Sequence, residues 1–279
     1  MKILLISLLV VCSGCTSVFY HPSRDTYFEP TDKLGLNVEN IYFSSENGPK
    51  IHAWFIQSKT KPAKGTVMQF HGNAENMTSH FLSTIWVTQH GYNLFTFDYR
   101  GYGKSEGDPY PAGVLLDSLQ AFEKVFELTK SKEHEVIVYA QSLGSIIALD
   151  ALTHLLDYRP IRSVVIEGGF LSYRKIARKK MAGSWLTWPF QWLPYVLVSD
   201  RHSPKKSMNK LSDIPLLSLH SERDPIIPID HGKNVYRAKR GAKCFWSVPE
   251  QGHTNLMNIE KGKYREPMLK FLDTQKCPN

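Results

Sequence analysis

A serine between small residues separates an apolar run from a helix-like stretch of this sequence. Ser142 follows the apolar run Val136–Tyr139 and precedes the helix-like stretch Ser145–Leu152. Ala140 and Gly144 are small enough for a sharp strand-to-helix turn, although glycine is the usual residue at the first of these positions. Such a turn exposes the hydroxyl at the end of a sheet and points the first N–H groups of a helix at its target. The pattern predicts a nucleophile at Ser142.

A nucleophilic serine needs a base and a group that orients the base. His253 follows Gly252 just beyond the apolar run 244–248, and Asp224 follows the apolar run 215–219. The Asp224 carboxylate would accept the Nδ1 proton of His253 and so fix the ring tautomer. A histidine or an Asp-Pro taken alone is more often structural, and it is the position of each at a strand end that favours a Ser142, Asp224, His253 triad.

Two backbone N–H groups are candidates for the oxyanion hole. The sequence His71-Gly72-Asn73 follows the apolar run 66–70, and Gly72 allows the chain to turn toward the serine. We expect the N–H groups of Asn73 and Leu143 to stabilise the oxyanion. His71 is expected to hold this loop rather than to act as a base. Ser145 is a poor rival nucleophile because it would lie inside the helix.

Short apolar runs alternate with helix-like stretches through most of the chain. The first two, 38–43 and 51–56, are predicted to pair through the turn Asn47-Gly48. The alternation predicts an α/β fold, with a mostly parallel sheet covered by helices on both faces. The expected strands after this pair are 66–70, 93–97, 136–139, 163–166, 215–219 and 244–248, with helices over 77–90, 113–130, the stretch after Ser142 and 256–272. One domain over 38–275 accounts for this pattern.

The interval 170–211 interrupts the alternation. It is rich in tryptophan and other aromatic residues, and within it a run of basic residues precedes these aromatic residues. We expect a small helical cap above the carboxyl ends of the strands, where such sheets bind ligands. Trp185 and Trp188 are candidate substrate contacts for an apolar acyl chain. Glu167, at the end of a predicted strand, is a candidate contact for a substrate amine.

Several motifs occur in order over nearly the whole chain after the first residues. They are His71-Gly-Asn-Ala, Asp98-Tyr-Arg-Gly-Tyr-Gly-Lys-Ser105, Ala140-Gln-Ser-Leu-Gly144, Asp224-Pro-Ile-Ile-Pro228 and Gly252-His253. Together they resemble the α/β-hydrolase superfamily and, more narrowly, its short-capped ABHD-type serine hydrolases. That group includes protein depalmitoylases, which release palmitate, and is similar to prolyl-oligopeptidase-like enzymes. The resemblance implies the same triad of Ser142, Asp224 and His253, while Ala140 and the aromatic cap depart from the commonest pattern.

Residues 1–15 have the layout of a secretory signal. A short basic start is followed by an apolar stretch and by Ser13-Gly14-Cys15, which resembles a bacterial lipobox with Cys15 as the lipidated residue. An ordinary cleaved signal and an uncleaved anchor are the alternatives. Residues 16–37 are predicted to be a tether. Thr16, rather than Asp, after the cysteine implies an outer-membrane lipoprotein facing the periplasm.

The net charge bears on the binding partners, and the two cysteines outside the first fifteen residues bear on disulfide formation. The net charge is +8, yet no nucleic-acid-binding motif accompanies it, so we expect no nucleic acid. In an exported protein a basic surface would face anionic lipid. Cys244 and Cys277 would pair in an oxidising periplasm or remain as two free thiols.

The predicted activity is hydrolysis of a carboxylic ester or thioester through an acyl-serine, on a small-molecule or lipid-like substrate. The mechanism requires no metal and no organic cofactor. The first alternative is a serine peptidase or amidase, which would use the same triad to cleave an amide bond. A non-catalytic, lipid-anchored envelope binding protein is the alternative from a different class.

Overall fold

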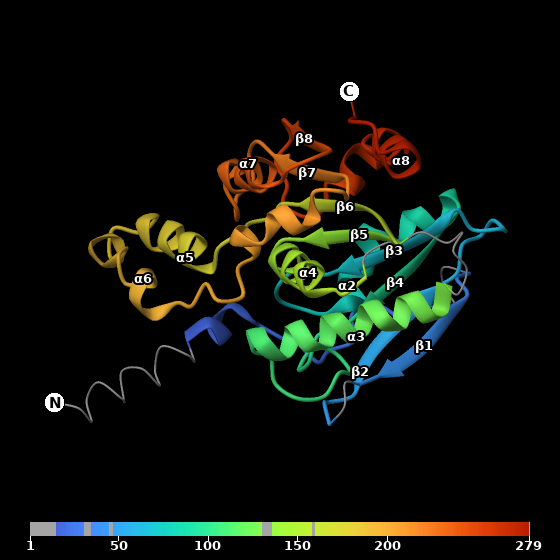
Figure 1. The fold of residues 1–279 in the computed structure, drawn as a ribbon, viewed down its shortest axis with the longest axis horizontal. Coiled ribbons are helices and arrows are strands. Elements are labelled where there is room, and N and C mark those ends of the chain that lie inside the picture. The colour runs from blue at the N-terminus through green and yellow to red at the C-terminus, as the bar shows by residue number, and fades with distance from the viewer. Residues whose placement is uncertain (1–14, 31–34, 45–46, 130–135, 158–159, 279) are drawn as a thin grey trace.

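A single sheet forms the centre of the molecule (Figure 1). The computed structural model describes residues 15–30, 35–44, 47–129, 136–157 and 160–278. In these residues eight strands pair in the order β1-β2-β4-β3-β5-β6-β7-β8, and only β2 runs antiparallel to its neighbours. The strands are β1 (Val38–Phe43), β2 (Ile51–Ile56), β3 (Gly65–Phe70), β4 (Tyr92–Phe97), β5 (Val136–Gln141), β6 (Ile161–Glu167), β7 (Leu216–Ser221) and β8 (Lys243–Val248). The predicted mostly parallel sheet is confirmed.

The two faces of the sheet each carry a hydrophobic core, because successive side chains of a strand point to opposite faces. In β5, Val138 and Ala140 join one core and Ile137 and Tyr139 join the other. The first core also contains residues of α3 (Pro111–Thr129), α4 (Leu143–His154) and α7 (Ile229–Ala238). The second contains residues of α2 (Met77–His80) and α8 (Arg265–Thr274). Both faces are therefore covered by helices, as predicted.

Two of the expected helices are broken. The range 77–90 is divided into α2 and the 3₁₀ segments η2 (Phe81–Ser83) and η3 (Ile85–His90). There the hydroxyls of Ser83, Thr84 and Thr88 each donate to the carbonyl three residues earlier, a bond that suits the tighter 3₁₀ turn. The range 256–272 is divided into η7 (Leu256–Lys261) and α8, because Glu260, Lys261 and Gly262 all have positive φ.

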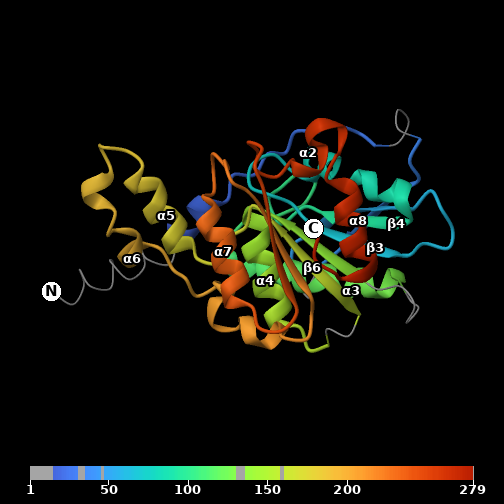
Figure 2. The same cartoon turned by 90° about the horizontal axis from the view of Figure 1, so that it is seen from above.

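The interval 170–211 forms a separate excursion from the sheet. It contains α5 (Tyr173–Ala182), η4 (Trp188–Phe190), α6 (Pro194–Leu197), η5 (Pro204–Lys206) and η6 (Met208–Leu211). Figures 1 and 2 show α5 and α6 projecting from the body, on the side from which the described chain begins. Large apolar side chains remain exposed here, among them Trp185, Leu186, Trp188, Phe190 and Trp192.

The predicted tether is in close contact with the rest of the protein in its described part. Tyr20 is buried and its hydroxyl is 3.0 Å from that of Tyr173 in α5. The Ser199 N–H donates to the hydroxyl of Thr16, just after Cys15, where the 3₁₀ segment η1 (Cys15–Phe19) begins. Residues 1–14, which make up all of the predicted signal except Cys15, lie outside the described residues. No helix of the described chain is both long and apolar enough to cross a bilayer.

A disulfide joins Cys244 in β8 to Cys277 beyond α8, with 5.5 Å between their Cα atoms. Of the two alternatives left open by the sequence, the structure contains the paired form. The bond closes a loop over a sequence separation of 33 residues. Restriction of the unfolded chain by a loop of this length contributes about 3–4 kcal/mol to stability.

Reduction is therefore expected to lower the free energy of unfolding by about 3–4 kcal/mol. Urea denaturation with and without dithiothreitol measures this difference. Cys277→Ser is the control, because its stability should match that of the reduced parent and should not respond to the reductant. Equal stability of the oxidised and reduced parent would contradict the prediction.

Candidate active site

Ser142 occupies a strained turn between β5 and α4. Its φ of 51° and ψ of −118° lie where side chains other than glycine are rarely found, a placement that costs about 1–3 kcal/mol. Close packing holds the turn, since a Cβ added at Gly144 would come within 2.3 Å of the Phe70 carbonyl oxygen. Ser142 keeps 9% of its surface exposed, whereas Gln141 and Ser145 on either side are fully buried. The turn therefore singles out one serine.

Asp224 and His253 meet beyond the ends of β7 and β8. The Nδ1 atom of His253 is 2.7 Å from Oδ2 of Asp224, whose side chain is fully buried. The other carboxylate oxygen, Oδ1, accepts hydrogen bonds of 2.8 Å from the N–H groups of Ile226 and Ile227. With its carboxylate fixed in this way, Asp224 can hold His253 with Nδ1 protonated and Nε2 free to accept a proton.

The chain around Ser142 is bonded to the chain around His253. The Ser142 N–H donates to the Glu167 carbonyl, and the Gln141 side-chain amide donates to the Thr254 carbonyl over 2.8 Å. A Cβ added at Gly168, which has a φ of +60°, would lie 3.0 Å from Nδ1 of His253. No hydrogen bond between the Ser142 hydroxyl and the His253 ring is present among the described residues. Such catalytic hydrogen bonds are often long until substrate binds.

Glu167 was predicted to contact a substrate amine, but its side chain is buried in the structure. Its carboxylate is buried and accepts hydrogen bonds from the Tyr139 hydroxyl, the Gln141 amide and the Leu256 N–H. Burial raises the pKa of Glu167, and these three donors oppose that rise. A buried carboxylate with these partners is not available to a substrate amine. Instead it attaches the segment just after His253 to the end of β5, so we reinterpret Glu167 as a positioning residue.

Glu167→Gln is expected to lower both stability and turnover. One carboxylate oxygen becomes an NH₂ group that opposes a donor, which costs about 1–3 kcal/mol in a buried site. The loosened 253–256 segment should lower kcat more than it changes KM. Denaturation and steady-state kinetics measure the two effects, with Glu266→Gln, an exposed change on α8, as the matched control. An equal kcat in both variants would contradict a positioning role.

The two proposed oxyanion donors lie next to the serine. Gly72 is close enough that a Cβ there would be 3.6 Å from Cβ of Ser142, and Asn73 follows it. Leu143 is the first residue of α4, so its N–H has no partner within the helix. In the described part of the chain, neither the Asn73 nor the Leu143 N–H has a hydrogen-bond acceptor. Both N–H groups are therefore free to donate a hydrogen bond to a ligand.

A buried layer of polar side chains supports the Asn73 loop. Burial lowers the pKa of His71 to about 3, so its ring is neutral at pH 7. The ring lies on Tyr99, and its Nε2 is 3.5 Å from Oδ1 of Asp98. Oδ1 of Asp98 also accepts the Met77 N–H at the start of α2. These contacts give His71 a structural place in the loop that carries Asn73.

The N-terminal segment adds contacts that the sequence did not indicate. The side-chain oxygen of Asn73 accepts hydrogen bonds from the His21 N–H and the Tyr102 hydroxyl. The Asn76 amide donates to the Ser23 carbonyl, and the Ser23 N–H donates to the Glu75 carbonyl. Residues 20–25 therefore hold the loop that carries the proposed oxyanion donor.

The two tryptophans predicted to contact substrate are exposed to solvent. Trp185 is 88% exposed and Trp188 is 58% exposed. Both belong to the segment between α5 and α6, at the end of the cap that is farthest from the sheet in Figure 1. The prediction that they contact substrate is therefore not supported by their position. No group of three or more His, Cys, Asp or Glu side chains suited to a metal ion occurs in the described ranges.

Comparison with known proteins decides the family. The model of a family described as serine aminopeptidase, S33, matches residues 61–213. The chain belongs to this family. It is 30% identical to YfhR of Escherichia coli over 97% of this chain and 94% of that protein. It is also 27% identical to the lysophosphatidylserine lipase ABHD12 of Xenopus tropicalis, over 91% of this chain and 73% of that one.

Solved structures agree on the fold. The esterase Pf2001 of Pyrococcus furiosus superposes with a TM-score of 0.69 over 91% of this chain and 96% of that chain, at 20% identity. At that identity the likeness concerns the fold alone. Family, relatives and fold together make this chain an ABHD-type α/β-hydrolase, as the sequence motifs predicted.

Proposed function

We propose that this α/β-hydrolase cleaves carboxylic esters or thioesters through an acyl-serine formed on Ser142. The observation that carries the proposal is the strained Ser142 turn, joined through neighbouring residues to a histidine whose Nδ1 is held by a buried carboxylate. A hydroxyl at such a turn, with a free imidazole nitrogen nearby, is the arrangement that acyl transfer requires.

The reaction proceeds in two halves. His253 Nε2 takes the Ser142 proton as the oxygen attacks the carbonyl carbon, and the Asn73 and Leu143 N–H groups bind the oxyanion. Collapse breaks the bond to the alcohol or thiol, which leaves with the proton from His253. Water activated by the same ring then attacks the acyl-serine and releases the acid. The chemistry needs no metal or organic cofactor.

Ester cleavage is favoured over the alternative of peptide or amide cleavage. The description of the family names an aminopeptidase, and such an enzyme must bind a free amine. Glu167, the acid predicted for that purpose, is buried and already has three hydrogen-bond donors. The relative ABHD12 is named as a lipase, which cleaves carboxylic esters.

Two measurements on the purified protein test the proposal. A fluorophosphonate probe should label the parent at Ser142, and p-nitrophenyl esters should be hydrolysed much faster than matched aminoacyl p-nitroanilides. Faster cleavage of the anilides would replace the ester proposal by the peptidase alternative. A folded protein that neither labels nor cleaves either substrate would instead favour the non-catalytic binding protein.

We also propose that Cys15 carries a lipid anchor that places the protein in a bacterial envelope, at the outer membrane and facing the periplasm. The hydroxyl of Thr16 accepts a hydrogen bond from the N–H of Ser199, which follows α6, so the anchor would begin next to the cap interval. Metabolic labelling with an alkyne fatty acid should mark the full-length parent and not Cys15→Ser. Equal labelling of the two proteins would refute the anchor.

A further inference from the structure

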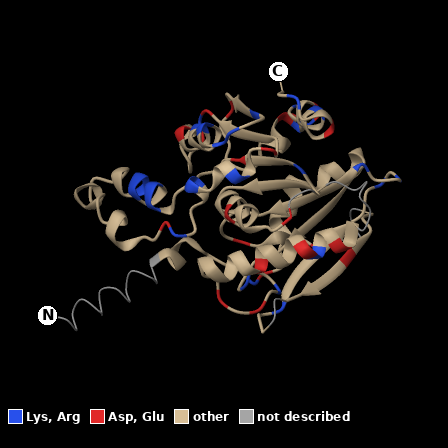
Figure 3. Ribbon diagram, in the orientation of Figure 1, with Lys and Arg blue, Asp and Glu red and all other residues tan. Residues whose placement is uncertain are grey.

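A cluster of cations lies between the cap and the body, outside the catalytic residues. Figure 3 shows basic residues gathered on α5. On its inner side a cavity of about 240 Å³ is lined by the polar side chains Ser172, Lys175, Lys205, His231, Asn234 and Arg237. We call this cavity the basic pocket. It shares Lys175, His231 and Asn234 with an adjoining cavity of about 400 Å³ that Arg178 and Lys179 also line.

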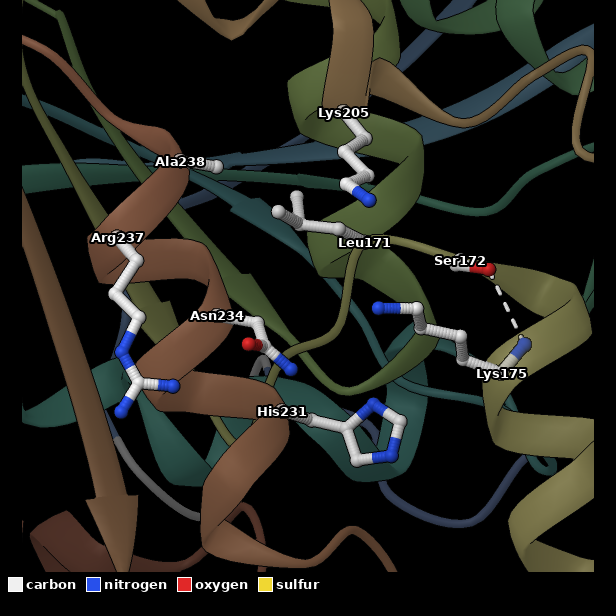
Figure 4. Close-up of a pocket in the computed structure, with 8 residues that line it drawn as sticks. All are labelled: Leu171, Ser172, Lys175, Lys205, His231, Asn234, Arg237 and Ala238. Atoms are coloured by element: carbon white, nitrogen blue, oxygen red, sulfur yellow. Dashed lines mark hydrogen bonds between the residues drawn. The ribbon is translucent and has the colours of Figure 1, made fainter.

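The side chains of the basic pocket converge from three elements. In Figure 4 the ammonium groups of Lys175 from α5 and Lys205 from η5 extend into the same space, across from the Asn234 amide of α7. Arg237 lines the cavity from the next turn of α7. Two ammonium groups and an amide donor thus face one space, and the guanidinium of Arg237 lies apart from them in Figure 4.

These cations have no carboxylate of their own. Among the described residues, no acidic side chain lies within 4 Å of Lys175, Lys205 or Arg237, and none lines the basic pocket. The nearby Asp200 accepts from the Ser172 hydroxyl and the Arg174 N–H, while Asp230 lines only the adjoining cavity. Like charges gathered without a counter-charge repel one another, so a bound anion would stabilise the arrangement.

The titration of His231 supports a positive potential here. Its pKa is lowered, first by burial and then by the charges of His220 and Lys175, against a smaller opposing effect of Asp230. The neighbourhood therefore already disfavours a further positive charge at the edge of the pocket.

The basic pocket lies close to the catalytic residues. Gly168 packs against the His253 ring, and Leu171, which also lines the pocket, is three residues further on. Three residues span at most about 11 Å. On the other side, α7 begins five residues after Asp224. The segment 168–171 therefore connects the contact with His253 to the wall of the basic pocket.

We propose that the basic pocket is a phosphate site, and that it binds the phosphate group of an acyl ester whose acyl carbon is attacked by Ser142. Two lysines whose ammonium groups face one space suit a multiply charged oxyanion better than a single carboxylate. The assignment of the phosphate to a substrate rests on the proposed esterase activity. Free phosphate is the other source of the same chemistry, and the experiment separates the two.

The test uses a soluble pair of esters, 1-butanoylglycerol 3-phosphate and uncharged 1-butanoylglycerol. The parent should prefer the phosphorylated ester in kcat/KM by about tenfold or more, the range of a charge-assisted contact. Lys175→Ala/Arg237→Ala should lose this preference. The matched control is Lys180→Ala/Lys233→Ala, which removes two charges from the same helices at positions that line neither cavity. It should keep the preference.

Calorimetric titration with inorganic phosphate gives a readout independent of turnover. Binding to the parent and the control, but not to the lining variant, supports the site even if no ester is cleaved. Phosphate binding without preference between the two esters would assign the pocket to free phosphate and end the substrate assignment. No phosphate binding to the parent, or equal binding to both variants, would overturn the phosphate site. A parent protein that binds phosphate but cleaves neither ester would count against the proposed function only.

Discussion

Ser142→Ala is expected to lower kcat for ester hydrolysis by about 10⁴- to 10⁶-fold, the loss found when the nucleophile of a catalytic triad is removed. The remaining rate would come from the oxyanion donors and from substrate binding. The substituted side chain keeps its Cβ and the strained φ of 51°, so the fold should persist. Steady-state kinetics with p-nitrophenyl butyrate and far-ultraviolet circular dichroism measure the two properties.

Ser145→Ala is the matched control, since Ser145 is the next serine and is fully buried in α4. Its hydroxyl bonds to the Ser142 carbonyl and the Phe170 N–H, so the change should reduce stability while fluorophosphonate labelling at Ser142 remains. Ser142→Gly should be as inactive as the alanine variant and more stable by about 1 kcal/mol or more, because glycine relieves the strain at positive φ. Turnover of Ser142→Ala within tenfold of the parent would exclude Ser142 as the nucleophile.

The strand ends were the part of the site that the sequence could locate. Ser142, Asp224 and His253 each follow a short apolar run, and parallel strands place their carboxyl ends at one edge of a sheet. The helix α7 was missed, although Val235 packs into the core, because Pro228, Asp230 and Gly232 interrupt its apolar pattern. Propensity is a weak guide where a helix is stabilised by packing on a sheet.

The roles of side chains beyond the strand ends depended on contacts between distant residues. Glu167 at the end of a strand is equally consistent with a substrate contact and with a structural residue. Its three donors come from β5 and from the 253–256 region, and no local pattern reveals such partners. Residues 16–30 likewise lacked periodicity, because their stability comes from contacts such as Tyr20 with Tyr173 rather than from regular structure.

Asp224→Asn tests whether the buried carboxylate directs the proton of His253. Oδ1 accepts two backbone N–H groups at 2.8 Å, so an asparagine should keep its oxygen there and turn its NH₂ group toward Nδ1 of His253. The ring would then accept at Nδ1 and carry its proton on Nε2, the tautomer that cannot receive the proton of Ser142. A change of tautomer in this arrangement lowers kcat by about 10⁴-fold.

A nearby acidic residue provides a matched control for Asp224→Asn. Asp230 is the acidic residue in the first turn of α7, and Asp230→Asn removes the same charge six residues along the chain. It should retain most of the ester turnover and the rate of fluorophosphonate labelling, whereas Asp224→Asn should lose both while remaining folded. If the two variants have similar kcat values, His253 does not depend on the Asp224 carboxylate. In that case the hydrogen bond of 2.7 Å between them is structural, and the base must be oriented in another way.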